Sequence, residues 1–249
     1  MSKLPRQSGY SDFAQAYDAL TFNVPYDEIA EYYRGILCGL TDGRRLLDMG
    51  CGTGNLSVRL AKLGFNVIGQ DASTEMLTIA AAKSSKIRWI CQDMAQTELA
   101  APVDAVISTL DSINHLRNVG EMERCFRAAA GSLEKGGVFA FDVNTVYKHR
   151  EILGSNTFVY DVDGVYCVWQ NEFDPSDNGV DIELDLFFED EDGAYVRGYE
   201  SFREVAVTEG ELRRLLEKSG FRIVEIWEYL THSIPNDKSE KLMIVAEKL

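Results

Sequence analysis

Three features of the sequence predict an α/β fold built on a mostly parallel sheet. Five short apolar segments between residues 45 and 143 are typical of buried strands, and segments with helical spacing of their apolar residues separate them. Two further strand-like segments, 221–229 and 241–247, end the chain, and the stretch between them is too short for a helical crossover, which predicts antiparallel pairing. From residue 157 to 206 the apolar period changes to two, which indicates a small antiparallel β insertion after the fifth strand.

The elements of the α/β region follow one another in a regular order. The first 35 residues have apolar positions at helical spacing, and Pro25 interrupts them before a second helical stretch. The five strands are expected at residues 45–49, 66–71, 87–91, 103–108 and 138–143, and helices between them at 55–62, 74–83 and around 122–133. Ser73 is positioned to cap the second of these helices, and Gly136 and Gly137 are expected to end the third.

The insertion and the region after it carry clear turn and capping signals. The dipeptides Asp163-Gly164, Asn178-Gly179 and Asp192-Gly193 each separate runs of β-forming residues, so a hairpin is expected at each. Thr208 and Glu211 fit a capping box that opens a further helix. We therefore divide the chain into N-terminal helices and an α/β core over 1–156, the β insertion over 157–206, and the C-terminal part of the core over 207–249.

Composition and charge narrow the classes of function. The formal net charge of −15, without any Lys/Arg cluster that has interleaved aromatic residues, argues against nucleic acid as a partner. No apolar run reaches the ~18 residues of a membrane span, and the N-terminus lacks the apolar stretch of a secretory signal, so a cytoplasmic protein is expected. The five cysteines include no C-x-x-C pair, which favours free thiols, and no metal site is expected.

Residues 46 to 55 carry the main functional signal. A predicted strand runs there into three alternate glycines, Gly50, Gly52 and Gly54, before a helix. Because glycine has no Cβ atom, the backbone can turn sharply and approach a ligand closely, with N–H groups at the helix start available to an anion. Asp71 closes the second strand, where a carboxylate can accept hydrogen bonds from both hydroxyls of a ribose. Together these features predict a nucleotide-type cofactor.

The spacing of the glycines separates two classes of nucleotide-binding enzyme. The dinucleotide fingerprint is G-x-G-x-x-G, whereas this loop reads Asp48-Met-Gly-Cys-Gly-Thr-Gly and resembles the first motif of class I S-adenosylmethionine-dependent methyltransferases. Residues 69–76 resemble the second motif of that family and residues 91–94 the third, and the region after Thr208 fits its late features. The resemblance implies a Rossmann-like, mostly parallel seven-stranded sheet with an antiparallel last strand, and S-adenosylmethionine as the cofactor.

The resemblance also implies roles for particular residues. In the family, an acidic residue at the position of Asp48 supports the methionine part of the cofactor. Asp71 would bind the ribose and Met76 would pack near the adenine, whose amino group and ring would bond to Asp93 and to the amide of Met94. The predicted cofactor-binding set is Tyr10, Tyr17, Asp48, Gly50, Cys51, Gly52, Gly54, Asn55, Asp71, Ala72, Met76, Asp93 and Met94.

The sequence after the fourth strand narrows the resemblance to enzymes with small acceptors. Residues 111–116, Asp-Ser-Ile-Asn-His-Leu, are similar to glycine N-methyltransferase and amino-sugar N-methyltransferases, whereas the Asn/Asp-Pro-Pro-aromatic run of enzymes that methylate base or glutamine amino groups is missing. In the similar enzymes, antiparallel strands also follow the fifth strand. Tyr10 and Tyr17 would then cover the methionine end of the cofactor, although aromatic residues seven apart on a helix are equally typical of a core.

Two side chains near the end of the fourth strand are candidate catalytic bases. The sulfonium already makes the methyl group electrophilic, so the main tasks of the enzyme are alignment and exclusion of water. An ammonium or hydroxyl acceptor must also lose a proton, which Asp111 or His115 could take. Asp111 could instead only cap the following helix, and His115 could be a core or capping residue.

The acidic insertion has several possible roles. Residues 151–200 hold 14 Asp or Glu and Arg197 as their only basic residue, and the acids Asp181, Glu183 and Asp185 alternate with aliphatic residues, which predicts a solvated face. The insertion could also roof the acceptor site, where an acidic rim would favour a cationic amine. A third hypothesis is a homodimer formed through its aromatic side, with Tyr166, Trp169, Phe173, Phe187 and Phe188.

The sequence thus predicts an S-adenosylmethionine-dependent methyltransferase that acts on a small-molecule acceptor, with N-methylation favoured over O-methylation. The alternatives are a non-catalytic module that binds S-adenosylmethionine or a partner, and an NAD-dependent oxidoreductase.

Overall fold

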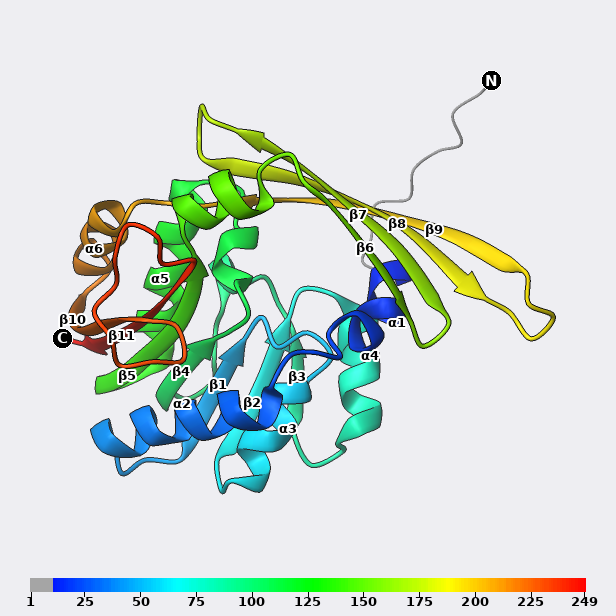
Figure 1. Cartoon of the computed structure of the whole chain (residues 1–249). Helices are drawn as coiled ribbons and strands as arrows, with labels where there is room; N and C mark the ends of the chain where they lie inside the picture. Colours follow the sequence, from blue (N-terminus) through cyan, green and yellow to red (C-terminus); the bar gives the residue numbers. More distant parts are fainter. Residues whose placement is uncertain (1–10) are drawn as a thin grey trace.

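The computed structural model describes residues 11–249, and its centre is a seven-stranded sheet (Figure 1). Its strands are β1 (Arg45–Met49), β2 (Asn66–Asp71), β3 (Arg88–Cys91), β4 (Val103–Ser108), β5 (Leu133–Asn144), β10 (Phe221–Glu228) and β11 (Lys241–Lys248). They lie in the order β10-β11-β5-β4-β1-β2-β3, and β11 is antiparallel to both of its neighbours. The predicted fold class is confirmed, and the reversal of strand order between β1 and β4 marks the edge where such sheets bind ligands.

Helices cover both faces of this sheet. α2 (Tyr26–Leu40) and α3 (Asn55–Lys62) bury their apolar stripes against one face, and α5 (Val119–Ser132) and α6 (Glu209–Lys218) cover the other. α6 begins with the predicted capping box, in which the side chains of Thr208 and Glu211 each bond to the other's backbone. The remaining helices, α1 (Ser11–Leu20) and α4 (Thr74–Lys83), lie beside the ligand-binding edge (Figure 1). Ser73 caps α4 as predicted, since its Oγ accepts from the N–H of Met76 at 3.1 Å.

The insertion forms a second, four-stranded antiparallel sheet that lies across the carboxyl edge of the first (Figure 1). Its strands are β6 (Thr157–Val162), β7 (Val165–Asp174), β8 (Gly179–Glu189) and β9 (Tyr195–Val205), so the three predicted hairpins are confirmed. Asp163 and Asn178 take positive φ at two of the turns, a conformation that Asp and Asn tolerate better than most residues. The inner face of this sheet buries Ile182 and Leu184 against α1.

The aromatic residues of the insertion, which were expected to share one side, lie on both faces of the sheet. Tyr166 pairs with Phe187, and Val165 pairs with Phe188. Because successive side chains of a strand point to opposite faces, Tyr166 and Phe187 lie on the outer face with the acids, and Phe188 lies on the inner face. Trp169 and Phe173 join the inner, apolar cluster. The outer face is therefore mixed, and the dimer remains a prediction.

The fifth strand also differs from its predicted bounds. β5 begins at Leu133, five residues before the expected start, because Leu133 pairs with Val103 before the register shifts. Gly136, with φ +75°, and Gly137 lie at this irregularity rather than behind a helix end. A Cβ on Gly137 would lie 2.9 Å from the carbonyl oxygen of Glu134, so the close backbone approach requires glycine.

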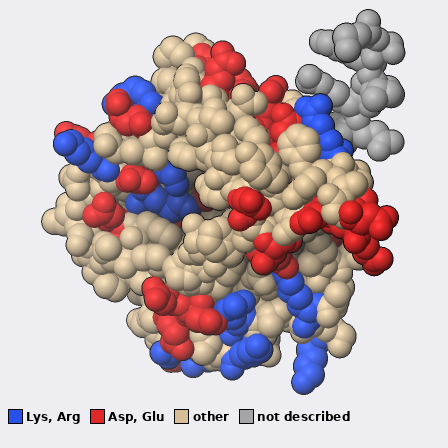
Figure 2. Space-filling model, turned by 45° about the vertical axis from the view of Figure 1, so that its right-hand side comes forward, with Lys and Arg blue, Asp and Glu red and all other residues tan. Residues whose placement is uncertain are grey.

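The charged side chains on the face shown in Figure 2 are mixed in sign, with basic groups scattered between acidic ones. On the outer face of the insertion, Arg203 pairs with Asp181, Asp174 and Asp177, and Arg197 pairs with Asp185. These exposed pairs contribute little stability each, but they offset part of the negative charge of the insertion. Within residues 11–249, no helix is long and apolar enough to cross a membrane.

Candidate active site

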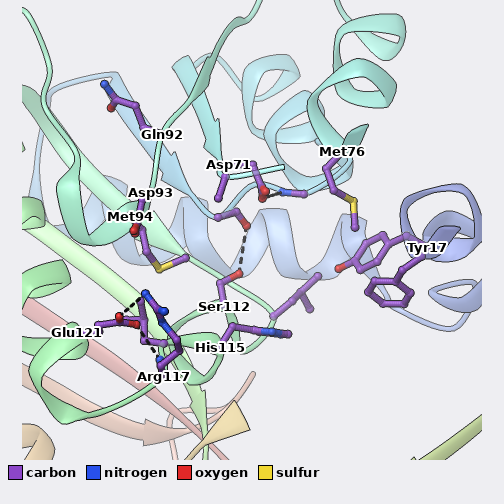
Figure 3. A pocket seen from close by; sticks show the side chains of 16 residues that line it. Tyr17, Asp71, Met76, Gln92, Asp93, Met94, Ser112, His115, Arg117 and Glu121 are labelled. Carbon is purple, nitrogen blue, oxygen red and sulfur yellow. Dashed lines mark hydrogen bonds and ion pairs between the residues drawn. The ribbon is translucent and has the colours of Figure 1, made fainter. Parts of the chain in front are cut away.

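A pocket of about 350 Å³ opens at the carboxyl edge of the large sheet, between the loop after β1, the ends of β2, β3 and β4, and helix α1 (Figure 3). It is lined by Phe13, Tyr17, Gly50, Gly52, Asp71, Ala72, Met76, Gln92, Asp93, Met94, Leu110, Ser112, His115, Leu116, Arg117 and Glu121. A narrow recess adjoins it beneath the glycine loop, where Tyr17 and Ser112 also lie, together with Cys51 and Asn55.

The glycine loop approaches the pocket with its backbone exposed. Gly50 and Gly52 have φ of +79° and +53°, and both line the pocket. A Cβ on Gly50 would lie 2.8 Å from the Cβ of Ser112, so the loop and the short helix after β4 can meet only with glycine here. Gly54, also predicted to bind the cofactor, is not among the residues that line the pocket or the recess, and its role stays a prediction. It packs on Trp89, whose ring a Cβ would approach within 2.6 Å.

The carboxylate of Asp71 stands at the end of β2 between the glycine loop and α4. One oxygen accepts from the N–H of Gly52 at 2.8 Å, and the other accepts from the N–H of Ser73 at 2.9 Å. Burial raises the pKa of Asp71, and the backbone donors partly offset this effect. Each oxygen keeps one further lone pair, so the side chain can still accept hydrogen bonds from a ligand in the pocket. Ala72 and Met76 continue the same wall.

The third predicted motif forms one end of the pocket. Asp93 caps a short 3₁₀ turn, Met94–Gln96, with one oxygen accepting from the N–H of Ala95 at 2.8 Å. In Figure 3 the thioether of Met94 points into the cavity, and Arg117 and Glu121 lie beside it as an ion pair with a separation of 2.8 Å.

Asp48 lies behind the glycine loop and does not line the pocket. It is 1% exposed, and one carboxylate oxygen accepts a short hydrogen bond from Ser57. The other oxygen has no hydrogen-bond partner among the residues that the structure describes. Burial raises the pKa of Asp48 to about 7, with Ser57 acting in the opposite direction. A buried carboxylate oxygen without a donor is costly, so this position is suited to a cationic ligand group.

Of the two N-terminal tyrosines, Tyr17 lines both the pocket and the recess, and Tyr10 lies outside the described residues. Phe13 meets Tyr17 edge to face, with ring centroids 5.4 Å apart. Burial raises the pKa of Tyr17 well above its usual value, so its phenol stays protonated at neutral pH and can donate a hydrogen bond.

The two candidate bases occupy different environments. Asp111 does not line the pocket, and its carboxylate bonds to the ammonium of Lys241 at 2.7 Å. Burial would raise the pKa of Asp111, but Lys241 and Lys148 together hold it well below its usual range. A carboxylate so strongly stabilised as an anion is a poor proton acceptor, and it forms no side-chain cap either. His115 does line the pocket, and its ring points across it toward Tyr17 (Figure 3).

Asp111, His115 and Glu204 bring possible ligand atoms within 4.8 Å of one another, a separation that a metal ion could bridge. Lys241 already supplies a positive charge to Asp111 at this place. The expectation of no metal site stays a prediction.

Comparison with known proteins decides the family. Residues 46–137 match a family model described as a methyltransferase domain. A putative methyltransferase from Geobacillus sp. (strain WCH70) is 33% identical over 96% of this chain and 99% of its own length. A crystal structure of an S-adenosylmethionine-dependent methyltransferase from Clostridium acetobutylicum is 28% identical, with a TM-score of 0.86 over 96% of this chain and 98% of that one. The chain belongs to the S-adenosylmethionine-dependent methyltransferases. The amino pentose methyltransferase CalS10 of Micromonospora echinaspora has the same fold, with a TM-score of 0.75, 21% identity and all of both chains covered.

The site of this methyltransferase fits its cofactor, S-adenosylmethionine. Gly50 and Gly52 leave the room that a close ligand needs, Asp71 offers acceptor lone pairs to hydroxyls, and the unpaired oxygen of Asp48 is suited to an ammonium group. Sequence reasoning missed Gln92, Ser112 and the Arg117–Glu121 pair among the lining groups. The first two lie inside the recognised motifs and could have been found there, but the pair carries no sequence signal.

Proposed function

We propose that the methyltransferase holds S-adenosylmethionine along the pocket from Asp93 to Tyr17 and methylates a small amine beside His115. The single observation that carries this proposal is the lining of one continuous pocket by the second and third predicted motifs, Gly50 and Gly52 of the glycine loop, and His115. The adenine would lie at Asp93 and Met94 and the ribose at Asp71. The methionine end would lie against the glycine loop beneath Tyr17.

The charges near His115 favour a cationic acceptor. Glu204 places a carboxylate oxygen 3.8 Å from the ring, and Asp71 and Asp111 also act electrostatically on it. The acids of the outer face, from which an acidic rim was expected, face away from the pocket because they alternate with the buried residues of β8. An amine acceptor is in keeping with the name of the Micromonospora enzyme, an amino pentose methyltransferase.

The residues of the pocket supply orientation, proton acceptance and protection from water. When bound, S-adenosylmethionine supplies a methyl group on a positively charged sulfur. The glycine loop, Asp71 and Tyr17 would fix its direction, while α1 and the inner face of the insertion sheet cover the acceptor side. The pocket would hold an acceptor nitrogen in line with this methyl group, on the side opposite to the sulfur. The imidazole of His115 would accept the proton that the acceptor nitrogen loses when it gains the methyl group.

A binding and turnover experiment tests the proposal. Calorimetry with S-adenosylhomocysteine and with NAD is expected to show binding of the first only. A panel of glycine, glucosamine and other small amines is then compared with matched alcohols and carboxylic acids, with S-adenosylhomocysteine release as the measurement. Faster release with amines supports N-methylation. Preference for an alcohol or acid would overturn it, and binding without turnover of any acceptor would indicate a non-catalytic module.

Cofactor affinity should depend on pH through Asp48. If the α-ammonium of the cofactor lies near this carboxylate, only the ionised form attracts it, so affinity rises as the pH passes the pKa of about 7. We expect S-adenosylhomocysteine to bind about tenfold more tightly at pH 8 than at pH 6, and Asp48→Asn to bind weakly at both. A wild-type affinity independent of pH would contradict this placement.

Asp48→Asn, which should weaken cofactor binding, should make the ligand-free protein more stable. A raised pKa in the folded protein contributes stability that is fully present below about pH 4 and is lost as the pH rises through about 7. Above pH 8 the ionised carboxylate of Asp48 therefore lowers the free energy of unfolding. Asp48→Asn is expected to raise this free energy by roughly 3 kcal/mol, so the variant unfolds at a higher denaturant concentration. Chemical denaturation at pH 5 and pH 8 measures the difference.

A further inference from the structure

His115 is held from two directions by one strand of the insertion sheet. Phe202 of β9 lies against the imidazole, with ring centroids 5.0 Å apart and planes at 36°. Two residues further, on the same face of the strand, Glu204 places Oε1 3.8 Å from Nε2 of His115. Asn114 fixes the short helix of His115 to this strand, since its amide donates to the carbonyl oxygen of Val205 at 3.1 Å. The strand thus determines both the plane and one edge of the ring.

Glu204 is itself held in place by partners on the other side of its carboxylate. Its side chain is 4% exposed. Oε2 accepts a hydrogen bond from the amide of Asn144 at 3.0 Å and lies 3.3 Å from Nε2 of His149. A buried carboxylate persists only where other groups compensate its charge, so these contacts fix the side chain and leave Oε1 directed at His115.

His149 contacts a backbone carbonyl with one ring nitrogen and the Glu204 carboxylate with the other. Its Nδ1 lies 2.9 Å from the carbonyl oxygen of Asn178. A carbonyl oxygen can only accept, so Nδ1 carries a proton. On the opposite side, Nε2 faces a carboxylate oxygen of Glu204, and two lone pairs there would repel each other. A single proton between Nε2 and this oxygen, carried by either group, removes the repulsion and holds the two side chains together in a fully buried environment.

We propose that Glu204 is a positioning residue for His115, and that His149 and Asn144 hold its carboxylate for this purpose. The proposal rests on the proposed function in that it takes His115 as the proton acceptor. The carboxylate orients the imidazole and stabilises the imidazolium that forms when the acceptor loses its proton. The insertion sheet then completes the catalytic face as well as covering it.

Chemical modification tests this proposal without any methyl acceptor. Diethylpyrocarbonate reacts with neutral imidazole. The side chain of His115 is 28% exposed, so the reagent can reach it, and the rate of its modification can be followed by peptide mass spectrometry at pH 6. Because the carboxylate favours the charged ring, Glu204→Gln should make His115 react about fivefold faster. Asp111 and Asp71, the other acids that act on the ring, stay unchanged. Glu200→Gln is the matched control, a buried carboxylate on the same strand and face, and should leave the rate unaltered.

His149 reports in the same experiment whether the variant merely loosens the structure. It is fully buried and should remain unmodified in the wild type and in both variants. Modification of His149 together with His115 would show local opening and overturn the proposal. An unchanged His115 rate in Glu204→Gln would also overturn it, whatever acceptor the enzyme uses.

Kinetics with the best amine of the panel provides the second measurement. Glu204→Gln should lower kcat about tenfold or more, with the KM of the amine and the affinity for S-adenosylhomocysteine nearly unchanged. In a His115→Asn background the same change should have little further effect, because the two residues act as one unit. If the kcat losses of Glu204→Gln and His115→Asn multiplied in the double variant, Glu204 would have a structural role independent of His115. Failure of the wild type to methylate any amine would refute the proposed function and leave the modification result standing.

Discussion

Lys241→Met is expected to destabilise the protein by about 3–5 kcal/mol at neutral pH, because it leaves the fully buried carboxylate of Asp142 and the partly buried one of Asp111 without their cation. The ammonium of Lys241 lies 2.7 Å from Asp111 and 3.2 Å from Asp142, and the latter side chain is fully buried. Asp142 also accepts from the N–H groups of Leu110 and Asp111 at 2.8 Å each, so the ion pairs tie β11 to the loop that leads to His115. Equilibrium denaturation in urea measures the loss.

A matched control separates this effect from the loss of any lysine. Lys218 lies 2.7 Å from Glu123, the same distance as between Lys241 and Asp111, but the side chain of Lys218 is 59% exposed and that of Lys241 only 13%. Lys218→Met should cost less than ~1 kcal/mol, because water screens an exposed pair. Adding Asp111→Asn to Lys241→Met should recover part of the stability. A loss below ~1 kcal/mol in Lys241→Met alone would show that the lysine does not compensate these charges.

The pH dependence follows from the directions of the two shifts. The pKa of Asp111 is lowered, so its contribution is present above the unfolded value of about 4 and is lost as the pH falls through the folded value. Burial would lower the pKa of Lys241, but Asp111 and Asp142 together raise it, so its contribution is present below about 10.4 and is lost at higher pH. The stability difference between wild type and Lys241→Met should therefore be nearly constant from about pH 5 to pH 9.

The local patterns of the sequence predicted most of the fold. Of the strands that end at the pocket, β1, β2 and β4 have their predicted bounds and β3 begins one residue later, since each is a short apolar run between strong helix or turn signals. The hairpins at Asp163 and Asn178 followed from turn chemistry alone. The start of β5 was missed because Leu133 continues a helical spacing, and only its pairing with Val103 shows that it belongs to the strand.

The surroundings of the candidate bases could not be predicted in the same way. Asp111 and Lys241 are 130 positions apart, and nothing in either segment indicates that they meet. Asp111 and His115 were therefore both candidate bases at that stage, whereas the fold holds Asp111 in an ion pair with Lys241 and directs His115 into the pocket. Glu204 stood among the many acids of the insertion, and only the register of β9 places it on the inner face. Long-range contacts decide protonation states, so sequence motifs identify the cofactor loop better than the base.

Asp71→Asn is expected to weaken S-adenosylhomocysteine binding about 100-fold, which corresponds to about 3 kcal/mol. The carboxylate would bind the ribose hydroxyls, and it also orders the loop by accepting from the N–H of Gly52. An amide in its place keeps one acceptor oxygen, which the N–H of Ser73 engages, and turns a donor toward Gly52. Replacing one carboxylate oxygen by an amide nitrogen therefore weakens the ligand contacts and also disturbs the geometry of the glycine loop. Titration calorimetry at pH 8 measures the affinity.

Asp190→Asn shows whether this loss reflects the pocket or only the local turn. Asp190 accepts from the N–H two residues ahead at 3.0 Å, much as Asp71 accepts from Ser73, but it lies in the hairpin between β8 and β9. Its replacement removes a comparable local contact and should leave affinity unchanged. If Asp71→Asn remained folded and bound S-adenosylhomocysteine as tightly as the wild type, the ribose could not lie at the end of β2. The orientation of the cofactor along the pocket would then have to be reversed, with the adenine at Tyr17.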